Sequence, residues 1–253
     1  MVRLCLVGGL GRMGKAIASL AQSASDVAVA SVWESQAAIR RCSDFAGSTG
    51  YVKNTVAVEG DGEAAVRKAD VVIDFSLPGA FAEVLRECET ATKPLVTGTT
   101  GVDDKPTRLA SLALRVAVVA SPNMATGVNA LFRLCDAAAR EIGALSDIEI
   151  VETHHRAKQD MPSGTALELA RILSAVTGNK VPTHSLRVGD VPGKHTIVFA
   201  LKGETIEITH NALSRDCFAA GALLAARFVA KARPGLYTML DVIGSGKPEV
   251  KTS

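Results

Sequence analysis

The feature that most constrains the fold lies at the start of the chain, where a short apolar run leads directly into a group of glycines. Residues Val2–Val7 are strand-like, and Gly8-Gly9-Leu10-Gly11-Arg12-Met13-Gly14 follows them without a break. Gly9, Gly11 and Gly14 have the spacing G-x-G-x-x-G, which is typical of a dinucleotide-binding turn between a strand and a helix. One glycine permits the tight turn, one lets the backbone approach a pyrophosphate, and one lets the helix pack closely against the strand.

A second strand-like run, Val27–Trp33, ends next to an acidic residue, Glu34, which lies 20 residues after Gly14. A carboxylate at this position suits the hydroxyl groups of an adenosine ribose. The helix after the glycine turn would offer free N–H groups to the phosphates, and Arg12 would add a positive charge. The alternative, a glycine-rich turn without a ligand, leaves the acidic end of the second strand unexplained. The candidate cofactor-binding residues of this region are Gly8, Gly9, Leu10, Gly11, Arg12, Met13 and Glu34, with packing the favoured role of Met13.

The first half of the chain alternates strand-like and helix-favouring stretches with short connections. This alternation predicts parallel β-α-β units and therefore an α/β fold, a Rossmann-type doubly wound parallel sheet. The strand-like runs are residues 2–7, 27–33, 71–75, 95–97 and 115–120, and the helix-favouring stretches are residues 12–21, 63–68, 78–90 and 106–114.

Two further loops follow predicted parallel strands, at the sheet edge where ligands bind in such folds. Their small residues would let a cofactor lie against the backbone, and ordinary turn chemistry is the alternative. The candidate cofactor-binding residues in these loops are Gly98, Thr99, Thr100, Ser121, Pro122, Asn123 and Met124.

The pattern changes after Pro122, where longer helices and a hairpin predict a smaller α+β domain for substrate binding and oligomerisation. Helices are expected over residues 127–142, 163–176 and 215–231, and strands over residues 147–152, 195–201 and 205–210. We expect residues 236–243 to return to the first domain. The predicted domains are residues 1–125 with 230–253, and residues 126–229.

Composition and charge favour a small-molecule enzyme over other classes of protein. The formal net charge is only +2, and no basic run interleaved with aromatic residues points to a nucleic acid. The five cysteines are scattered without a C-x-x-C pair, which argues against disulfides and a zinc site. Neither a signal peptide nor an apolar run of roughly 18 residues is evident. We therefore expect a cytoplasmic protein with no metal and no membrane partner.

The chemistry is expected in the segment from Glu149 to Ala166. It reads as a strand that ends in a cationic loop and then enters a helix. The side chains of His154, His155, Arg156 and Lys158 lie within five residues. Ser163 is a good N-cap, with Gly164 and Thr165 in the first helical turn. Cations beside the N–H groups of a helix start predict a site for an anion such as a substrate carboxylate.

Adjacent histidines on a strand point to opposite faces, so one of the two is expected to meet the reacting atom. A histidine can donate a proton near neutral pH, and Lys158 is the other candidate donor. A solvated basic loop and a metal site are the alternatives, but no third metal ligand is found in register. Asp160 is expected either to fix the loop or to pair with Lys158.

The same segment resembles the signature E-[IV]-x-E-x-H-x-x-x-K-x-D-x-P-S-G-T-A of dihydrodipicolinate reductase, the 4-hydroxy-tetrahydrodipicolinate reductase of lysine and diaminopimelate biosynthesis. Every specified position is met from Glu149 to Ala166. The resemblance extends over nearly the whole chain. It includes the glycine turn, the loop 98–101, the run 207–210 and the run 218–222.

This resemblance implies that NADH or NADPH delivers hydride to a ring carbon of a cyclic imine-type dicarboxylate, with loss of water to give tetrahydrodipicolinate. It implies that His154 is a proton donor or acceptor and Lys158 a second proton donor. It also implies substrate binding by His155, Ser163, Gly164 and Thr165. The family fold is a Rossmann-type domain plus a substrate domain whose sheet builds a homotetramer.

The residues that follow Glu34 bear on the choice between NADH and NADPH. Some relatives carry an arginine directly after the ribose-binding acid, where it suits the 2′-phosphate of NADPH. Ser35 stands at this position, and Arg40 and Arg41 follow in a different register. Because Glu34 would repel a 2′-phosphate, we expect NADH to be favoured.

Two other functions fit parts of the sequence. A different Rossmann reductase, acting on an imine or amino acid, would explain the first domain but not the signature in the second. A dinucleotide-sensing protein without turnover would have no need of His154 and Lys158. His195 and His210 are expected to be structural residues of the hairpin. Arg187 and Arg215 are further candidates for pairing with a carboxylate, without a pattern that favours either.

Overall fold

The computed structural model describes residues 1–42 and 44–245. The chain forms two compact units, one made of the described residues up to 124 and from Phe218 onward, the other of Ala125–Cys217. The last residues of the predicted first domain, 246–253, lie outside the described residues. The second unit is thus one continuous segment, and the first is built from both ends of the chain.

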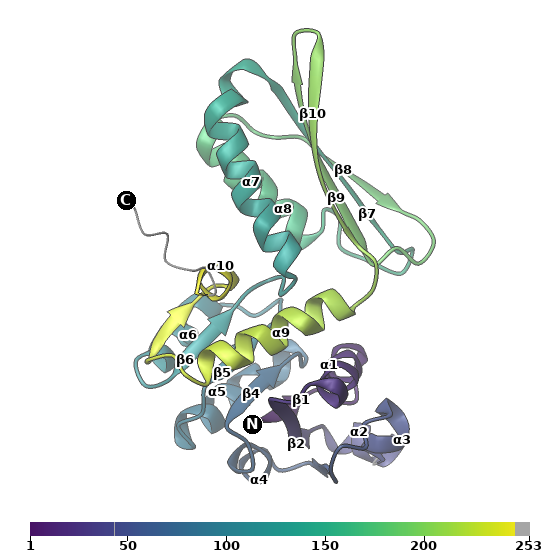
Figure 1. Ribbon diagram of the computed structural model, residues 1–253, viewed down its shortest axis with the longest axis vertical. Coiled ribbons are helices and arrows are strands. Elements are labelled where there is room, and N and C mark those ends of the chain that lie inside the picture. Colours follow the sequence, from purple (N-terminus) through teal and green to yellow (C-terminus); the bar gives the residue numbers. More distant parts are fainter. Residues whose placement is uncertain (43, 246–253) are drawn as a thin grey trace. The chain divides into compact units, whose positions relative to one another are not determined.

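The first unit is built on a seven-stranded sheet in the order β11-β6-β5-β4-β1-β2-β3, in which all pairs are parallel (Figure 1). From β1, the chain runs outward to β2 and β3 on one side and to β4, β5 and β6 on the other. The strand order therefore reverses beside β1, which is the position where such sheets bind ligands. The strands are β1 (Val2–Val7), β2 (Val27–Trp33), β3 (Ala57–Glu59), β4 (Val71–Asp74), β5 (Leu95–Thr97), β6 (Ala117–Ala120) and β11 (Gly235–Tyr237).

Both faces of this sheet are buried, which explains why its central strands are almost continuously apolar. In β1, Leu4 and Leu6 point into one buried cluster, and Cys5 and Val7 point into another. This arrangement confirms the predicted doubly wound fold. The short helices of the unit are α1 (Arg12–Ser23), α2 (Gln36–Arg41), α3 (Phe45–Thr49), α4 (Gly62–Arg67), α5 (Phe81–Thr90), α6 (Lys105–Ala113) and α10 (Met239–Gly244).

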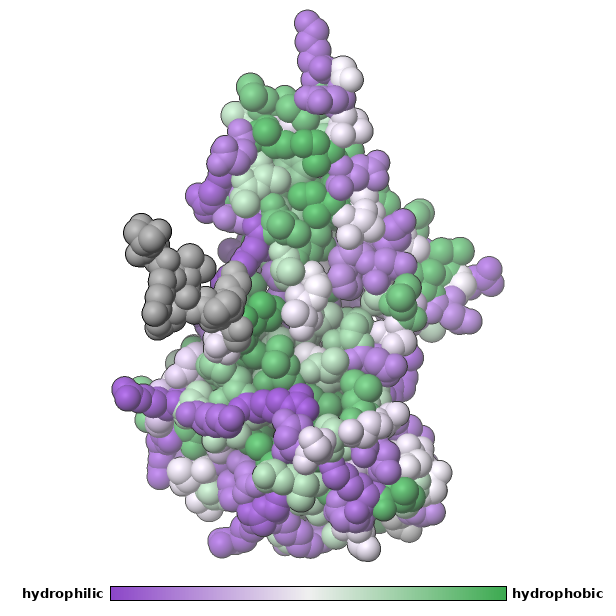
Figure 2. Space-filling model, in the orientation of Figure 1, coloured by the Kyte–Doolittle hydropathy of each residue, from purple (hydrophilic) through white to green (hydrophobic). Residues whose placement is uncertain are grey.

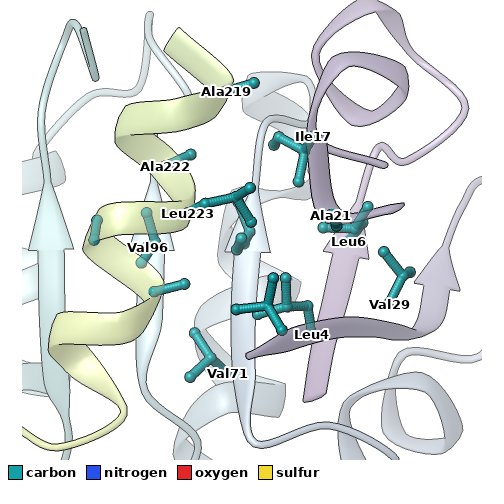
Figure 3. Packing of buried hydrophobic residues seen from close by; sticks show 14 of the residues in the cluster. Leu4, Leu6, Ile17, Ala21, Val29, Val71, Val96, Ala219, Ala222 and Leu223 are labelled. Carbon is teal, nitrogen blue, oxygen red and sulfur yellow. The ribbon is translucent and has the colours of Figure 1, made fainter. Parts of the chain in front are cut away.

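Helix α9 (Asp216–Val229) completes the core of the first unit (Figure 3). Ala219, Ala222 and Leu223 on this helix belong to the same buried cluster as Leu4 and Val96 of the sheet. From the sequence, this helix is predicted to lie in the second domain, with the boundary after residue 229, whereas the chain returns to the first unit at residue 218. An alanine-rich helix is recognisable from sequence, but the partner that buries it is not.

The second unit has a four-stranded mixed sheet in the order β10-β9-β7-β8, covered by α7 (Thr126–Ile142) and α8 (Gly164–Thr177) (Figure 1). Strand β7 (Asp147–His154) pairs antiparallel with β9 (Gly193–Leu201) and parallel with β8 (Thr183–Arg187). Strand β10 (Glu204–Ala212) forms a hairpin with β9.

Burial alternates along β7, as expected for a sheet with helices on one face. Ile148, Ile150, Glu152 and His154 are buried, while the residues between them are half-buried. The strand continues two residues beyond its predicted end at residue 152, so His154 is a strand residue with a defined face. Strand β8 was not predicted, because Thr183–Arg187 lacks a β-branched run and lies at the sheet edge.

None of the helices within residues 1–42 and 44–245 combines the length and apolar character needed to cross a bilayer. Among the cysteines, Cys5, Cys88 and Cys135 are buried.

Replacing Leu6 with alanine should test the packing of the seven-stranded sheet. Leu6 is 1% exposed, so Leu6→Ala is expected to lower the free energy of unfolding by about 2–5 kcal/mol through lost burial and a residual cavity. Urea denaturation followed by circular dichroism would measure the change. Leu114 is 82% exposed, and Leu114→Ala, the matched control, is expected to change stability by no more than about 0.5 kcal/mol. Equal losses in the two variants would contradict the described core.

Candidate active site

The glycine turn after β1 has a conformation that side chains would prevent. Gly8 adopts a φ of +75°, in the left-handed region that favours glycine. A Cβ on Gly14 would overlap the backbone of Gly9, so α1 can approach the turn only because Gly14 has no side chain. The backbone of the turn is consequently open to a phosphate group, and the N-terminus of α1 begins directly behind it.

Glu34 is fixed against this turn by a hydrogen bond in which the Leu10 N–H donates to the Glu34 carboxylate over 2.8 Å. A cavity of about 570 Å³ lies beside this contact, and its lining includes Gly8, Leu10, Gly11 and Glu34. Glycine backbone and a carboxylate therefore meet at one cavity, which is the combination that suits the adenosine half of a dinucleotide. These residues fit the cofactor predicted from the sequence.

The start of α2 contributes to the same cavity. Ser35 is the N-cap of this helix, and its Oγ accepts a hydrogen bond from the Ala38 N–H over 3.2 Å. Arg41 also lines the cavity, while its Nε donates to the carbonyl of Ala37 over 3.1 Å. The guanidinium of Arg41 is thus hydrogen-bonded within α2, and the Oγ of Ser35 caps the start of the same helix.

A buried carboxylate organises the loops at the ends of β4 and β5. Asp74 Oδ2 accepts hydrogen bonds from Thr97 Oγ1 over 2.9 Å and from Thr99 Oγ1 over 2.8 Å. Its Oδ1 accepts from the N–H and the hydroxyl of Ser76, over 3.0 Å and 2.6 Å. The carbonyl of Thr99 accepts a hydrogen bond from Lys105 Nζ. Asp74 therefore acts as an anchor that holds two loops beside the glycine turn.

Burial lowers the pKa of Lys105, against the opposing effect of the Asp74 carboxylate. Asp74 itself was not predicted from the sequence. The available signal was an acidic residue ending an otherwise apolar strand, Val71–Asp74.

The other predicted cofactor residues occupy several environments. Gly98 packs against the ring of Phe75, which lines the cavity, and Met13 packs against the core. Met124 is 1% exposed and belongs to the same core. The Ser121 hydroxyl donates to the Asn123 carbonyl over 2.7 Å, as in an ordinary turn. Among the described residues, the cavity lining does not include Gly9, Arg12, Met13, Gly98, Thr99, Thr100, Ser121, Pro122, Asn123 or Met124.

The second unit contains a buried ion pair between adjacent strands. Arg187 on β8 donates two hydrogen bonds to the Glu152 carboxylate on β7, over 2.8 Å and 3.0 Å. The side chain of Glu152 is fully buried and that of Arg187 is 8% exposed. Arg187 also donates to the carbonyl of Asp160 over 2.6 Å. Since buried charges are costly unless they are paired, this geometry keeps both side chains fixed.

His154 lies two residues after Glu152 on the same buried face of β7. Its Nδ1 is hydrogen-bonded to Glu152 Oε2. The ring of His195 meets the His154 ring edge-on, with centroids 5.1 Å apart and an interplanar angle of 74°. A Cβ on Gly193 would lie 3.0 Å from His154 Nε2, so the absence of a side chain at this residue leaves space beside that nitrogen.

The pKa values of these groups shift for identifiable reasons. Burial alone would raise the pKa of Glu152, but hydrogen bonds from Arg187, Ser185 and His154 lower it to about 2. Burial lowers the pKa of His154, and the carboxylate of Glu152 only partly compensates. Burial, followed by the repulsion of His154, lowers the pKa of His195 to about 3. Glu152 is therefore a carboxylate and His195 a neutral ring at neutral pH.

The start of α8 is joined to this buried group through Ser163. The Ser163 N–H donates to Glu152 Oε1 over 3.3 Å, and its Oγ lies 3.1 Å from His195 Nε2. The same Oγ accepts from the Ala166 N–H over 3.2 Å, as predicted for an N-cap. Gly164 is exposed, with open space where a Cβ would stand, and Thr165 is buried. The first turn of α8 is thus anchored at its cap and accessible at Gly164.

Lys158 and Asp160 form an ion pair over 2.8 Å, one of the two roles considered for Asp160. The Lys158 N–H also donates to the carbonyl of His155 over 3.1 Å, which closes a turn of the loop. His155 is half-buried. The predicted residues His154 and Ser163 are thus linked through Glu152 and His195, while His155 and Lys158 lie in the loop between them.

Glu152, Gly193 and His195 were not predicted as site residues, and Arg187 was considered only as a candidate partner of a carboxylate. For Glu152, the missed signal was its spacing of two residues from His154, which places both side chains on one face of a strand. Arg187 lies on β8, a strand that the sequence did not reveal. In the part of the chain that the structure describes, no group of three or more His, Cys, Asp or Glu residues is placed to hold a metal ion.

Comparison with known proteins identifies the family. The model for the N-terminus of dihydrodipicolinate reductase matches residues 2–124, and the model for its C-terminus matches residues 127–243. The 4-hydroxy-tetrahydrodipicolinate reductase of Alkalilimnicola ehrlichii is 40% identical over 270 residues, which cover 96% of this chain and 98% of that protein. The chain belongs to the dihydrodipicolinate reductase family. The enzyme of the same name from Syntrophobacter fumaroxidans is 39% identical, over 96% of this chain and 99% of the relative.

Similar solved structures show the same fold at lower sequence identity. The dipicolinate-bound dihydrodipicolinate reductase from Paenisporosarcina sp. TG-14 has a TM-score of 0.78 and 23% identity, over 96% of this chain and 99% of that chain. GenD2 from gentamicin A biosynthesis, in complex with NAD, has a TM-score of 0.64 and 11% identity, over 96% of this chain and 90% of that chain.

Membership of the dihydrodipicolinate reductase family confirms the resemblance predicted from the segment between Glu149 and Ala166. The chain is an oxidoreductase whose Rossmann-type unit binds NAD(P)H. Because the family match also extends through the second unit, a reductase related only through its Rossmann fold does not account for the sequence.

The low pKa of Glu152 makes the stability of the protein depend on pH. A carboxyl group whose pKa is depressed on folding contributes stability above its unfolded pKa, and that contribution is lost as the pH falls toward the folded pKa. The window therefore runs from the ordinary value of 4.5 down to about 2. Glu152→Gln is expected to be less stable at pH 7 by about 3–5 kcal/mol, because Arg187 loses its charged partner. It should also lose less stability than the wild type between about pH 5 and about pH 3, a range that covers the upper part of this window.

Urea denaturation at a series of pH values would measure both effects. Glu168 pairs with Arg171 on the surface of α8, where the arginine side chain is 67% exposed. Glu168→Gln is therefore the matched control and should keep the wild-type pH dependence. An unchanged slope in Glu152→Gln would contradict the assignment of a depressed pKa to this carboxyl group.

Proposed function

We propose that this enzyme catalyses the NAD(P)H-dependent reduction of 4-hydroxy-tetrahydrodipicolinate to tetrahydrodipicolinate in lysine and diaminopimelate biosynthesis. The observation that carries the proposal is the complete segment from Glu149 to Ala166. It folds so that a buried histidine and the start of α8 share the carboxylate of Glu152. The relatives that match over the full chain bear the name of this activity. A biosynthetic reductase of this kind is expected to work in the cytoplasm.

The first unit is proposed to hold the cofactor, through the glycine turn and Glu34. The reduced nicotinamide supplies the hydride. The residues that we assign to cofactor binding are Gly8, Gly9, Leu10, Gly11, Arg12, Met13, Glu34, Gly98, Thr99, Thr100, Ser121, Pro122, Asn123 and Met124. Gly8, Leu10, Gly11 and Glu34 have the strongest support because they line one cavity.

The second unit is proposed to bind the substrate through His155, Ser163, Gly164 and Thr165. The N-terminus of α8 carries a partial positive charge, which stabilises a carboxylate. Lys158, in the preceding loop, adds a positive side chain to this end of the unit, where it is paired with Asp160. The related structure from Paenisporosarcina sp. TG-14 is described as bound to dipicolinate. A cyclic dicarboxylate is the corresponding ligand for this chain.

The reaction takes up a hydride and a proton and releases water. His154 is proposed to donate or accept a proton at its Nε2, and Lys158 is the second proton donor. The side chain of His154 is only 10% exposed, so most of its ring is shielded from bulk water. A general acid of this kind typically contributes about 10²–10⁴-fold in rate.

We also propose that the sheet of the second unit builds a homotetramer. Its face away from α7 and α8 is only half-buried along β7. Figure 2 shows hydrophobic residues on the second unit below the hydrophilic tip of its hairpin. Leu186 pairs with Thr153 on this face and is 52% exposed, which is consistent with a surface that a second copy covers.

The activity can be tested with purified protein, NADH, pyruvate, aspartate semialdehyde and the upstream synthase that makes the substrate. Loss of nicotinamide absorbance is expected only when all components are present.

His154→Ala should lower kcat by about 10²–10⁴-fold without changing the Kd for NADH, because the proton transfer is lost and the cofactor site is intact. A variant that turns over as fast as the wild type would remove the role assigned to His154. Absence of turnover by the wild type would refute the proposed function.

The cofactor preference follows from Glu34, whose carboxylate repels the 2′-phosphate of NADPH. We propose that NADH is favoured and expect kcat/KM for NADH to exceed that for NADPH by about tenfold, which corresponds to 1.4 kcal/mol. Glu34→Gln should reduce this ratio. Glu89 forms an exposed ion pair with Arg115, so Glu89→Gln is the control and should leave the ratio unchanged. A clear preference for NADPH in the wild type would refute the proposal.

A further inference from the structure

The hydrogen bond between His154 and Glu152 determines which nitrogen of the histidine ring carries a proton. Glu152 accepts two hydrogen bonds from Arg187 and one from the Ser163 N–H. A carboxylate in this environment has no proton to donate, so it can only accept from His154. The proton must therefore be on Nδ1, and the neutral ring keeps its lone pair on Nε2.

Gly193 determines what can approach Nε2. Its backbone lies on β9, next to the end of β7, and it is buried. A Cβ at this residue would stand 3.0 Å from Nε2 and 3.3 Å from Cδ2 of the ring, closer than an ordinary van der Waals contact. Any side chain at residue 193 would therefore crowd the ring beside Nε2. Glycine at residue 193 therefore leaves one approach to Nε2 open.

We propose that Glu152 is a positioning residue that holds His154 with its proton on Nδ1, that Arg187 fixes Glu152, and that Gly193 keeps Nε2 open for proton exchange with the substrate. The inference rests on the proposed function for the identity of the substrate. The arrangement of a carboxylate, a histidine and a reacting partner is the one by which other enzymes select a histidine tautomer.

The charged residues around His154 affect how readily its ring takes up a second proton. The carboxylate of Glu152 favours the protonated ring, while the charges of Lys158 and Arg187 disfavour it. The neighbouring His195 is buried and neutral. Glu152 is thus the group that stabilises a proton on Nε2 until it is transferred. Its removal should make the ring harder to protonate.

Nitrogen NMR of the histidine rings tests the tautomer directly and does not depend on turnover. The chain has five histidines, and the spectrum of His154→Ala assigns the signals of residue 154. In the wild type, Nδ1 is expected to be protonated and Nε2 unprotonated at pH 8. In Glu152→Gln, an amide replaces the carboxylate and can donate to Nδ1, so the proton should appear partly or wholly on Nε2. Glu168→Gln, on the surface of α8, should give the wild-type spectrum.

Kinetics provide a second readout for the same variants. Glu152→Gln should lower kcat by about 10²–10⁴-fold, as expected when a general acid–base group is disabled. The KM for NADH should be unchanged. The limb of the pH–rate profile that reports His154 should move to lower pH, because the charge that favours the protonated ring is gone. A purely structural role for Glu152 would lower the amount of folded enzyme without moving this limb.

Gly193→Ala separates access to Nε2 from the choice of tautomer and leaves the Glu152–Arg187 pair in place. We expect the Nδ1-protonated tautomer to persist while kcat falls at least tenfold. Gly244→Ala is the control, because a Cβ there meets no atom within 4 Å, and kcat should be unchanged.

A wild-type His154 with its proton on Nε2 would overturn the proposal, as would wild-type kcat in Gly193→Ala. If Glu152→Gln does not fold, the wild-type tautomer and Gly193→Ala still decide the question. A wild type that binds NADH but does not turn over the substrate would refute the proposed function. The NMR result for Glu152 would stand or fall independently of that outcome.

Discussion

The second unit depends on the compensation of one buried charge. Glu152 is fully buried, and its carboxylate is tolerable because it accepts two hydrogen bonds from Arg187 and one from the Ser163 N–H, besides those from Ser185 and His154. The donors come from different elements, because Arg187 is on β8 and Ser163 caps α8. The requirement to satisfy this carboxylate therefore fixes the edge strand and the start of the helix relative to β7, and His154 is held within the same set of contacts. The same carboxylate thus stabilises the fold of the second unit and holds the histidine that is proposed to transfer a proton.

Asp74 has a comparable position in the first unit. It too is a fully buried acid, but hydroxyl groups and a backbone N–H satisfy it in place of an arginine. These weaker partners are Thr97 at the end of β5 and Ser76 and Thr99 in the loops after β4 and β5, so the carboxylate holds together the sheet edge beside the glycine turn. Both units therefore use a buried acid at the end of a strand to position flexible segments. The sequence shows such an acid only as a polar residue that interrupts an apolar run.

Much of the fold could be predicted from the sequence, and the reasons for the exceptions are physical. The strands around the glycine turn were predicted well because buried parallel strands are nearly continuous apolar runs. Strand β8 was missed because Thr183–Arg187 alternates half-buried and exposed residues at a sheet edge. In the candidate site, His154 and Ser163 were predicted from local chemistry, whereas the partners of His154 depend on strand pairing. Gly193 was beyond sequence reasoning because its role lies in the space that it leaves.

The path of the chain through the two units has a consequence for the order of folding. Residues 125–217 form a continuous inserted segment, while the core of the first unit needs Ala219, Ala222 and Leu223 from after the insertion. During synthesis, the inserted unit is complete before the ribosome has produced α9 and β11. Synthesis of the first unit begins earlier, but its hydrophobic core is incomplete until the residues of α9 and β11 have been made. A ribosome that stalls after residue 217 would therefore carry a folded second unit and a first unit whose sheet lacks the packing of α9.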